Sequence, residues 1–172
     1  PCHAAELTSV IAFNKAISAC QKQQKWQESL LLLEELDHRS FQATTITYNA
    51  SINSCGKASE WPSALWLLEE LNASTQVEAD VISYSAAVSA MERSSKWQIE
   101  VLLLEEVERS LQADVIIYNA SISATEKAAE WPWALHLLQR ALRREVPVDV
   151  ITHNAAISAC EKAGEWQRAL DL

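Results

Sequence analysis

The chain has 172 residues, 49% of them hydrophobic, a formal net charge of −9 and a pI near 4.9. This length and hydrophobic content are typical of a folded protein with a sizeable core and exclude a disordered chain. The chain has only 2 Gly and 4 Pro, few for a β-rich fold but normal for helices joined by short connections. No stretch approaches about twenty uninterrupted apolar residues. The composition therefore predicts an all-α protein without a membrane-spanning helix.

The chain is interpreted as an excerpt from a longer protein. It opens at Pro1 rather than Met and stops at Leu172 within an apolar helical pattern, so a targeting segment would lie outside it. Residues 1–9 form an irregular lead-in, interpreted as the end of a preceding unit.

A repeat follows the lead-in, since tryptophan recurs at nearly constant spacing. The steps are 35, 36, 34 and 35 residues, between Trp26, Trp61, Trp97, Trp131 and Trp166. The segments that precede these tryptophans align without gaps. We therefore predict tandem units at 10–44, 45–80, 81–114, 115–149 and a partial 150–172.

Each unit contains two helical patterns. In the fourth copy the first helix is predicted from about Ile117 to Lys127, with apolar residues every three to four positions. The second helix is predicted to begin near the tryptophan, where Pro62 and Pro132 fit a first helical turn. Neither helix is long enough to be stable alone, so neighbouring pairs must bury one another's faces. The sequence predicts an α-solenoid of helix-turn-helix repeats.

The cysteines indicate packing rather than chemistry. Cys20, Cys55 and Cys160 share one repeat position, at which Met91 and Thr125 stand in the other two copies. A position that accepts Cys, Met or Thr is a small packing site, so neither a disulfide nor a zinc site is predicted. Cys2 lies in the lead-in and supports no inference. We expect no metal and no cofactor.

A six-residue pattern carries a family resemblance. Asp-Val-Ile-x-Tyr-Asn runs from Asp114 to Asn119, and it recurs with His for Tyr from Asp149 to Asn154. With the period near 35, these units resemble pentatricopeptide repeats, a family of α-solenoids that bind single-stranded RNA, usually in organelles. The resemblance covers residues 10–172. It implies a right-handed superhelix and a location in the mitochondrion or chloroplast.

The resemblance also implies site residues, because in that family the fifth and last residues of a repeat read about one base. The fifth residues are Asn14, Asn49, Ser85, Asn119 and Asn154. The last residues of the complete units are Thr44, Asp80, Asp114 and Asp149. The second residues, which wedge between bases, are Ile11, Ile46, Ile82, Ile116 and Ile151. By the family's correspondences, the implied RNA core is pyrimidine-U-G-U.

The asparagines support this expectation independently of the family. Asn is a mediocre helix former, yet it holds the same first-turn position in four of the five copies. One explanation is that a ligand selects the amide. The other is that Asn and the preceding Asp satisfy free N–H groups at the start of the helix. The two explanations are compatible.

Basic residues recur eight positions after the fifth residue of each unit. They are Lys22, Lys57, Arg93, Lys127 and Lys162, and they are predicted to contact phosphates. The alternative is that each favours the helix macrodipole and needs no ligand. Acidic pairs late in the second helix, at 34–35, 69–70 and 105–106, are interpreted as a solvated outer face that could also contact protein partners.

The sequence offers no constellation of an active site, so no enzyme activity is predicted. Its four histidines fall at unrelated repeat positions, and two glycines cannot build a phosphate-binding loop. The first hypothesis is sequence-biased binding of single-stranded RNA, with a role in organellar RNA processing, stability, editing or translation. The alternative is a peptide-binding solenoid resembling tetratricopeptide arrays, which the acidic net charge favours.

Overall fold

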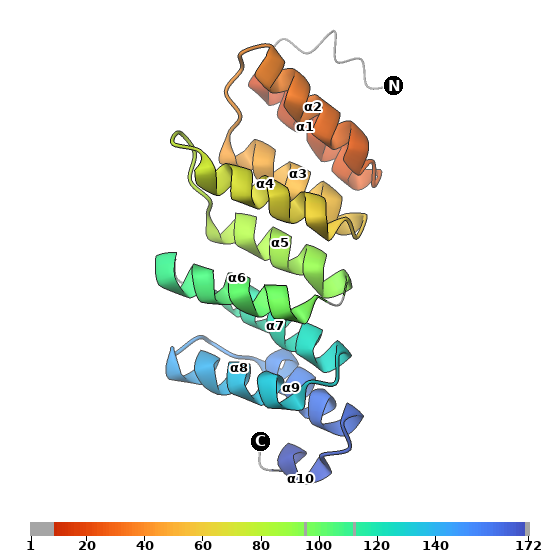
Figure 1. Cartoon of the computed structure of the whole chain (residues 1–172), viewed down its shortest axis with the longest axis vertical. Helices are drawn as coiled ribbons and strands as arrows, with labels where there is room; N and C mark the ends of the chain where they lie inside the picture. Colours follow the sequence, from red (N-terminus) through yellow and green to blue (C-terminus); the bar gives the residue numbers. More distant parts are fainter. Residues whose placement is uncertain (1–8, 95, 112, 171–172) are drawn as a thin grey trace. The chain divides into compact units, whose positions relative to one another are not determined.

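The chain is all-α in its described residues, which are 9–94, 96–111 and 113–170 of a computed structural model (Figure 1). The first helices of the repeats are α1 (Val10–Lys22), α3 (Thr45–Lys57), α5 (Val81–Arg93), α7 (Val115–Lys127) and α9 (Val150–Lys162). The second helices are α2 (Trp26–His38), α4 (Trp61–Ala73), α6 (Trp97–Ser110), α8 (Trp131–Arg143) and α10 (Trp166–Ala169). The predicted alternation of two helices per repeat is confirmed.

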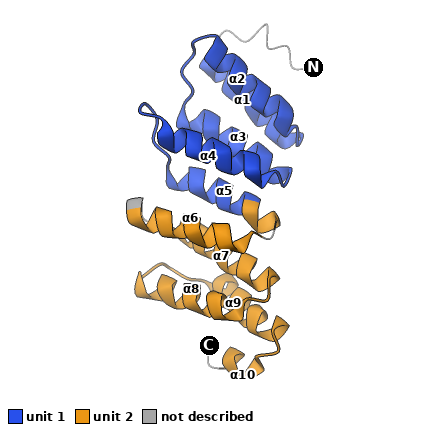
Figure 2. Cartoon of the chain, in the orientation of Figure 1, with its two compact units in different colours: residues 1–90 blue, residues 91–172 orange. Residues whose placement is uncertain are grey.

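Two compact units divide the chain at the last turns of α5, Pro1–Ala90 and Met91–Leu172 (Figure 2). In the first unit α1 packs on α2 and α3, and α3 also packs on α2 and α4. In the second unit α7 packs on α6, α8 and α9, and α9 packs on α8 and α10. Within the two units, α1 and α7 thus each contact their own second helix and the first helix of the next repeat. The boundaries of the five sequence repeats stay a prediction.

Side-chain caps set the start of the first helices. Ser9, Thr44, Asp114 and Asp149 each have extended backbone, and each accepts a hydrogen bond from a backbone N–H of the first turn. This satisfies a donor that a helix start leaves free. Because Asp114 caps α7, that helix begins at Val115, two residues earlier than the sequence pattern predicts.

The turn from first to second helix is the same in four repeats. The residue after the C-cap is left-handed, with φ of 58° at Gln24, 61° at Ser59, 56° at Ala129 and 77° at Gly164. In each turn the next N–H reaches back to the carbonyl of the packing residue, as from Lys25 to Cys20 at 3.0 Å. This is the Schellman arrangement, and it satisfies carbonyls that the helix end leaves open.

The core lies between the helices of successive repeats. In the first unit it includes Phe13, Ile17, Leu32 and Leu36, all fully or almost fully buried. The shared packing position is buried in every copy, whether it holds Cys20, Cys55, Met91, Thr125 or Cys160. The prediction of a packing role for these cysteines is confirmed, and Cys2 lies outside the described residues. Within the described ranges, no helix is long and apolar enough to cross a membrane.

Candidate nucleic-acid interface

The isoleucines at the second position of the first helices are exposed in both units. Their exposed fractions are 68% for Ile11, 67% for Ile46, 61% for Ile82, 57% for Ile116 and 66% for Ile151. A large apolar side chain gains nothing from folding when it stays in water. Each lies three residues before the fifth-position side chain, which places the two on one helix face. The same exposed residue in every copy indicates a surface shaped by something other than packing.

In the first unit, Asn49 and Asp80 form one hydrogen-bonded group with Ser83. The Asn49 Nδ2 donates to Asp80 Oδ1 at 3.2 Å, and the Ser83 hydroxyl lies 2.6 Å from Asn49 Oδ1 and 2.9 Å from Asp80 Oδ1. The Ser83 backbone N–H donates to the same carboxylate oxygen at 2.8 Å. Because the amide nitrogen faces a carboxylate and the amide oxygen faces a hydroxyl, the orientation of the Asn49 amide is fixed.

This group leaves one donor and one acceptor unused. Asn49 keeps its second N–H, and the hydrogen bonds from Asn49 and Ser83 all go to Asp80 Oδ1, which leaves lone pairs on Oδ2 to accept from a ligand. Burial raises the pKa of the Asp80 carboxyl, but the hydrogen bonds from Ser83 and Asn49 outweigh it and hold the pKa below 3.8. Asp80 is therefore ionised at neutral pH and can only accept a hydrogen bond. The pair presents an N–H donor beside an anionic acceptor.

The second unit repeats this arrangement with a threonine. The Thr152 hydroxyl lies 2.5 Å from Asn119 Oδ1 and 2.9 Å from Asp149 Oδ1, and the Thr152 N–H donates to Asp149 at 3.0 Å. Hydrogen bonds from the backbone and hydroxyl of Thr152, and one from Asn119, lower the pKa of the Asp149 carboxyl. The structure thus brings together two of the residue pairs that the sequence predicts.

The first pair is joined indirectly. The Thr47 hydroxyl donates to Asn14 Oδ1 at 2.7 Å and lies 3.0 Å from the Thr44 hydroxyl. Thr44 carries no charge, so this copy lacks the anionic acceptor of the other two.

For the remaining predicted base-reading residues, the described structure shows no hydrogen bond to another base-reading residue. The Ser85 hydroxyl donates to the Val81 carbonyl one turn earlier at 2.6 Å, and Asp114 caps α7. These two residues belong to different compact units. Asn154 is exposed in the first turn of α9 and makes no hydrogen bond through its side chain to another described residue.

The hydroxyl residues at the third position of the first helices were not predicted from the sequence. Thr47, Ser83 and Thr152 orient the asparagine amides, whereas Ile117 occupies this position in the fourth repeat and is fully buried. Their recurrence at the repeat period was the signal that could have found them. The signal is weak, because a hydroxyl at this position also fits a capping box at the helix start.

The predicted phosphate contacts differ between repeats. Lys127 Nζ lies 2.9 Å from Glu92 Oε1, and Lys162 Nζ lies 2.9 Å from Glu126 Oε1. Each of these carboxylates also accepts a hydrogen bond from a serine of the same first helix as the lysine, Ser123 or Ser158. Among described residues, Lys22, Lys57 and Arg93 have no ion pair. Gln21 and Gly56 stand where Glu92 and Glu126 stand in the later repeats.

The acidic second-helix residues are less uniformly solvated than the sequence predicts. Glu34 and Glu69 are exposed. However, Glu35 pairs with Arg39 at 2.6 Å, Glu70 accepts from the Tyr48 hydroxyl at 3.2 Å, and Glu105 lies 3.5 Å from Arg140. Glu35 and Glu105 are partly solvated ion-pair partners, whereas Glu70 has one buried carboxylate oxygen, so the solvated outer face stays a prediction.

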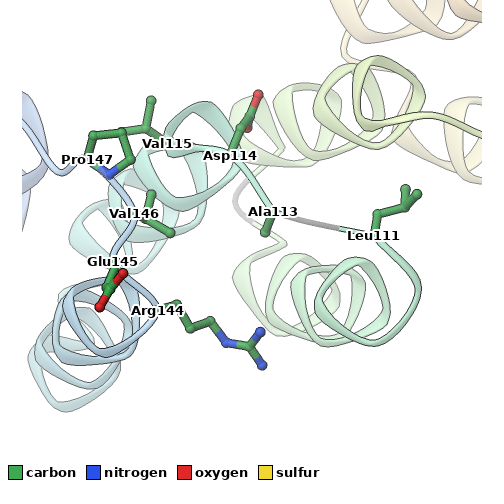
Figure 3. Close-up of a pocket in the computed structure, with 8 residues that line it drawn as sticks. All are labelled: Leu111, Ala113, Asp114, Val115, Arg144, Glu145, Val146 and Pro147. Atoms are coloured by element: carbon green, nitrogen blue, oxygen red, sulfur yellow. The ribbon is translucent and has the colours of Figure 1, made fainter.

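A cavity of about 560 Å³ lies in the second unit beside Asp114, between the ends of α6 and α8 and the start of α7 (Figure 3). Its other lining residues are largely aliphatic, and the Asp114 and Arg144 side chains point in different directions in Figure 3. Asp114 is engaged as the cap of α7, and Arg144 lies 3.1 Å from Glu108. The two charged groups Asp114 and Arg144 are thus each engaged outside the cavity.

Comparisons with known proteins agree with this architecture. Segments 46–74 and 151–172 match the family model described as the PPR repeat, where PPR stands for pentatricopeptide repeat. No curated protein sequence matches the chain significantly. The pentatricopeptide repeat protein PPR10 from maize is 16% identical with a TM-score of 0.86, over 96% of this chain and 24% of that chain. The chain thus spans about a quarter of the length of the maize protein.

Two similar structures contain RNA. PPR10 in complex with an 18-nt psaJ RNA element gives a TM-score of 0.79 at 16% identity, with the same coverage of 96% and 24%. The PPR domain of Arabidopsis thaliana protein-only RNase P 1, in complex with tRNA, gives a TM-score of 0.75 at 13% identity, over 91% of this chain and 84% of that chain.

The helix pairs and the structural matches define a helical-repeat protein of the α-solenoid class. Two segments, 46–74 and 151–172, also match the repeat model itself, so the chain is similar to pentatricopeptide repeat proteins in these two segments as well as in its fold.

Proposed function

We propose that the chain binds single-stranded RNA with a sequence bias, through the fifth and last residues of its repeats. The observation that carries this proposal is the oriented Asn49–Asp80 pair, repeated by Asn119 and Asp149. Uracil offers a carbonyl acceptor beside the N3–H donor on its Watson–Crick edge. The free Asn49 N–H matches the carbonyl, and Asp80 Oδ2 matches N3–H. Cytosine has an acceptor at N3, which the carboxylate repels.

The exposed isoleucines supply the second part of the proposed site. Ile46 and Ile82 flank the Asn49 pair along the chain and are 67% and 61% exposed. An apolar side chain between two unstacked bases loses its contact with water and supports the base planes, in the way that aromatic platforms do for single strands. The recurrence of isoleucine in all five copies then follows from the ligand.

The complexes of PPR10 with psaJ RNA and of the protein-only RNase P 1 domain with tRNA support RNA as the ligand class. By family resemblance we further propose a mitochondrial or chloroplast location, a role in RNA processing, stability, editing or translation, and no catalytic activity of these repeats. The proposed base order is pyrimidine-U-G-U.

The net charge of −9 limits the expected affinity. With Lys127 and Lys162 held by glutamates, three basic residues remain for phosphates, Lys22, Lys57 and Arg93. At about −0.7 per phosphate on single strands, the log–log salt slope should be about −2. Stacking and edge contacts of about 1–3 kcal/mol per base, less the cost of association, give micromolar affinity or weaker.

The test is fluorescence anisotropy with a short RNA centred on U-U-G-U, a scrambled RNA and the equivalent DNA. Asn49→Ala with Asp80→Ala should weaken binding of the matched RNA by roughly tenfold, one base contact of about 1.4 kcal/mol. The sharper variant is Asn49→Ser, which copies the Ser85 position and should shift preference from U-U-G-U to U-G-G-U. Equal affinity of wild type and variant for both RNAs would refute base reading. A folded, helical protein that binds no RNA at low salt would instead favour a peptide ligand.

A further inference from the structure

One cluster of charged side chains occurs in both units, but its acidic residues are paired with arginines only in the second unit. It is formed by the last turns of a second helix, the tyrosine of the next first helix, and the next second helix. Counting from the tryptophan of each second helix, Glu34, Asp37 and Glu70 correspond to Glu105, Glu108 and Arg140. Tyr48 corresponds to Tyr118, and Trp66 corresponds to His136.

In the second unit the cluster is complete. Arg140 Nη1 lies 3.5 Å from Glu105 Oε1, and Arg140 Nη2 pairs with Glu108 Oε2. Arg144 Nη2 also lies 3.1 Å from Glu108, whose side chain is only 1% exposed, and Tyr118 donates its hydroxyl to this carboxylate. The guanidinium thus bridges two carboxylates from neighbouring turns of α6. The positive charges of Arg140 and Arg144 thus offset the negative charges of Glu105 and Glu108.

In the first unit the cation is missing. Glu70 stands where Arg140 would be, and Ser74 stands in place of Arg144. The Tyr48 hydroxyl donates to Glu70 Oε1 at 3.2 Å, but Glu70 Oε2 is buried without a hydrogen-bond partner. Among the described side chains, none forms an ion pair with Glu34 or Asp37. Three carboxylates therefore face one region without a positive charge.

A cavity occupies this region of the first unit. Its volume is about 190 Å³, and its lining includes Glu34, Asp37, Glu70, Tyr48 and Trp66. Trp66 is 55% exposed, which leaves its ring open to a ligand at the rim. Within the described ranges, no group of acidic, His or Cys side chains is placed to hold a metal ion. The size and chemistry of the lining suit an organic cation.

The field in the cavity is negative. Burial raises the pKa of Tyr48 to about 12, with further contributions from the charge and hydrogen bond of Glu70 and the charge of Asp37. At Tyr118 burial and Glu108 also raise the pKa, but Arg144 and Arg140 oppose them. No such opposing cation acts on Tyr48. This field repels RNA phosphates, so the cavity is separate from the proposed RNA contacts.

We propose that this cavity takes the arginine side chain of a protein partner. The second unit shows the chemistry that the site accepts, because there the chain itself supplies a guanidinium to the equivalent carboxylates. Arginine fits better than lysine, since its planar fork reaches two carboxylates at once and can stack on an indole ring. The proposal does not depend on RNA binding.

The first experiment fills the cavity from within the chain. Glu70→Arg recreates the second-unit cluster and should raise Tm by about 2–4 °C. The matched control is Glu69→Arg, which makes the same charge change on an exposed neighbour and should leave Tm nearly unchanged. Equal Tm changes in the two variants would overturn the proposal.

The second experiment uses the wild-type chain, with an NMR titration of N-acetyl-arginine methylamide against its uncharged citrulline analogue. The Trp66 indole N–H resonance should shift with the arginine compound. The titration should give a Kd of about 1–10 mM, which corresponds to a binding free energy of about 3–4 kcal/mol. It should not shift with citrulline, and Glu70→Arg should abolish the arginine response. Identical responses to the two compounds, or none to either, would overturn the proposal even if RNA binding were established.

Discussion

Glu100 gives the sharpest prediction for stability. Its side chain is fully buried in α6, and neither carboxylate oxygen has a hydrogen-bond partner in the described structure. Burial raises its pKa from 4.5 to about 9, the charge of Glu92 adds to this, and Lys127 opposes it. The carboxyl is therefore protonated in the folded protein at neutral pH and ionised in the unfolded chain.

The pH dependence follows from this difference. Below pH 4.5 both states are protonated, and stability is greatest with respect to this group. As pH rises from 4.5 towards 9, the folded state must hold a proton that the unfolded state releases, so stability falls. Between pH 4.5 and 7 the loss is 2.5 pH units at about 1.36 kcal/mol each, or about 3 kcal/mol.

Glu100→Gln removes the titration while keeping the shape. The variant should match wild type at pH 4.5 and should be more stable by about 3 kcal/mol at pH 7. The assay is urea denaturation followed by circular dichroism from pH 4.5 to 8. The difference between the two curves isolates this residue, because every other titrating group is shared. Parallel pH profiles for wild type and variant would refute the reasoning.

Two further predictions concern the proposed RNA contacts. Replacing Glu92 and Glu126 together by Gln should release their paired lysines. RNA affinity at 0.1 M salt should then rise about three- to tenfold, and the log–log salt slope should steepen from about −2 to about −3.5. An unchanged slope in the anisotropy series would show that these lysines do not face phosphate. Ser83→Ala should free the Asn49 amide and raise the pKa of Asp80 towards 3.8, as measured by NMR titration of the Asp80 carboxyl. Binding of U-U-G-U RNA should weaken as well. A loss of Tm without either change would mean that the Ser83 hydroxyl only stabilises the helix start.

Most of the fold could be predicted from the sequence because it depends on local patterns. The tryptophan period located the second helices, which begin at Trp26, Trp61, Trp97, Trp131 and Trp166. The first helix of the fourth repeat was placed two residues late, because apolar periodicity does not include the polar cap. Asp114 was the local signal for the observed start at Val115.

The site could be predicted only in part. Family resemblance named Asn49 and Asp80, and the structure joins them by a hydrogen bond. The pairing of Lys127 with Glu92 was not predictable, because it links residues 35 positions apart through the packing of neighbouring first helices. The same holds for the cavity at Glu70, since a charge looks solvated in a single repeat until the side chains of the adjacent repeats are in place.

The left-handed turns and the exposed isoleucines recur in the repeats for different reasons. At Gln24, Ser59, Ala129 and Gly164 the backbone angle is the same while the side chain varies, so geometry alone maintains the position. At the second position of the first helices the reverse is true, because the isoleucine is constant and exposed although the backbone is ordinary helix. Sequence drift should therefore erase the exposed isoleucines first in any copy that has lost its ligand, while the turns persist in every copy that still folds.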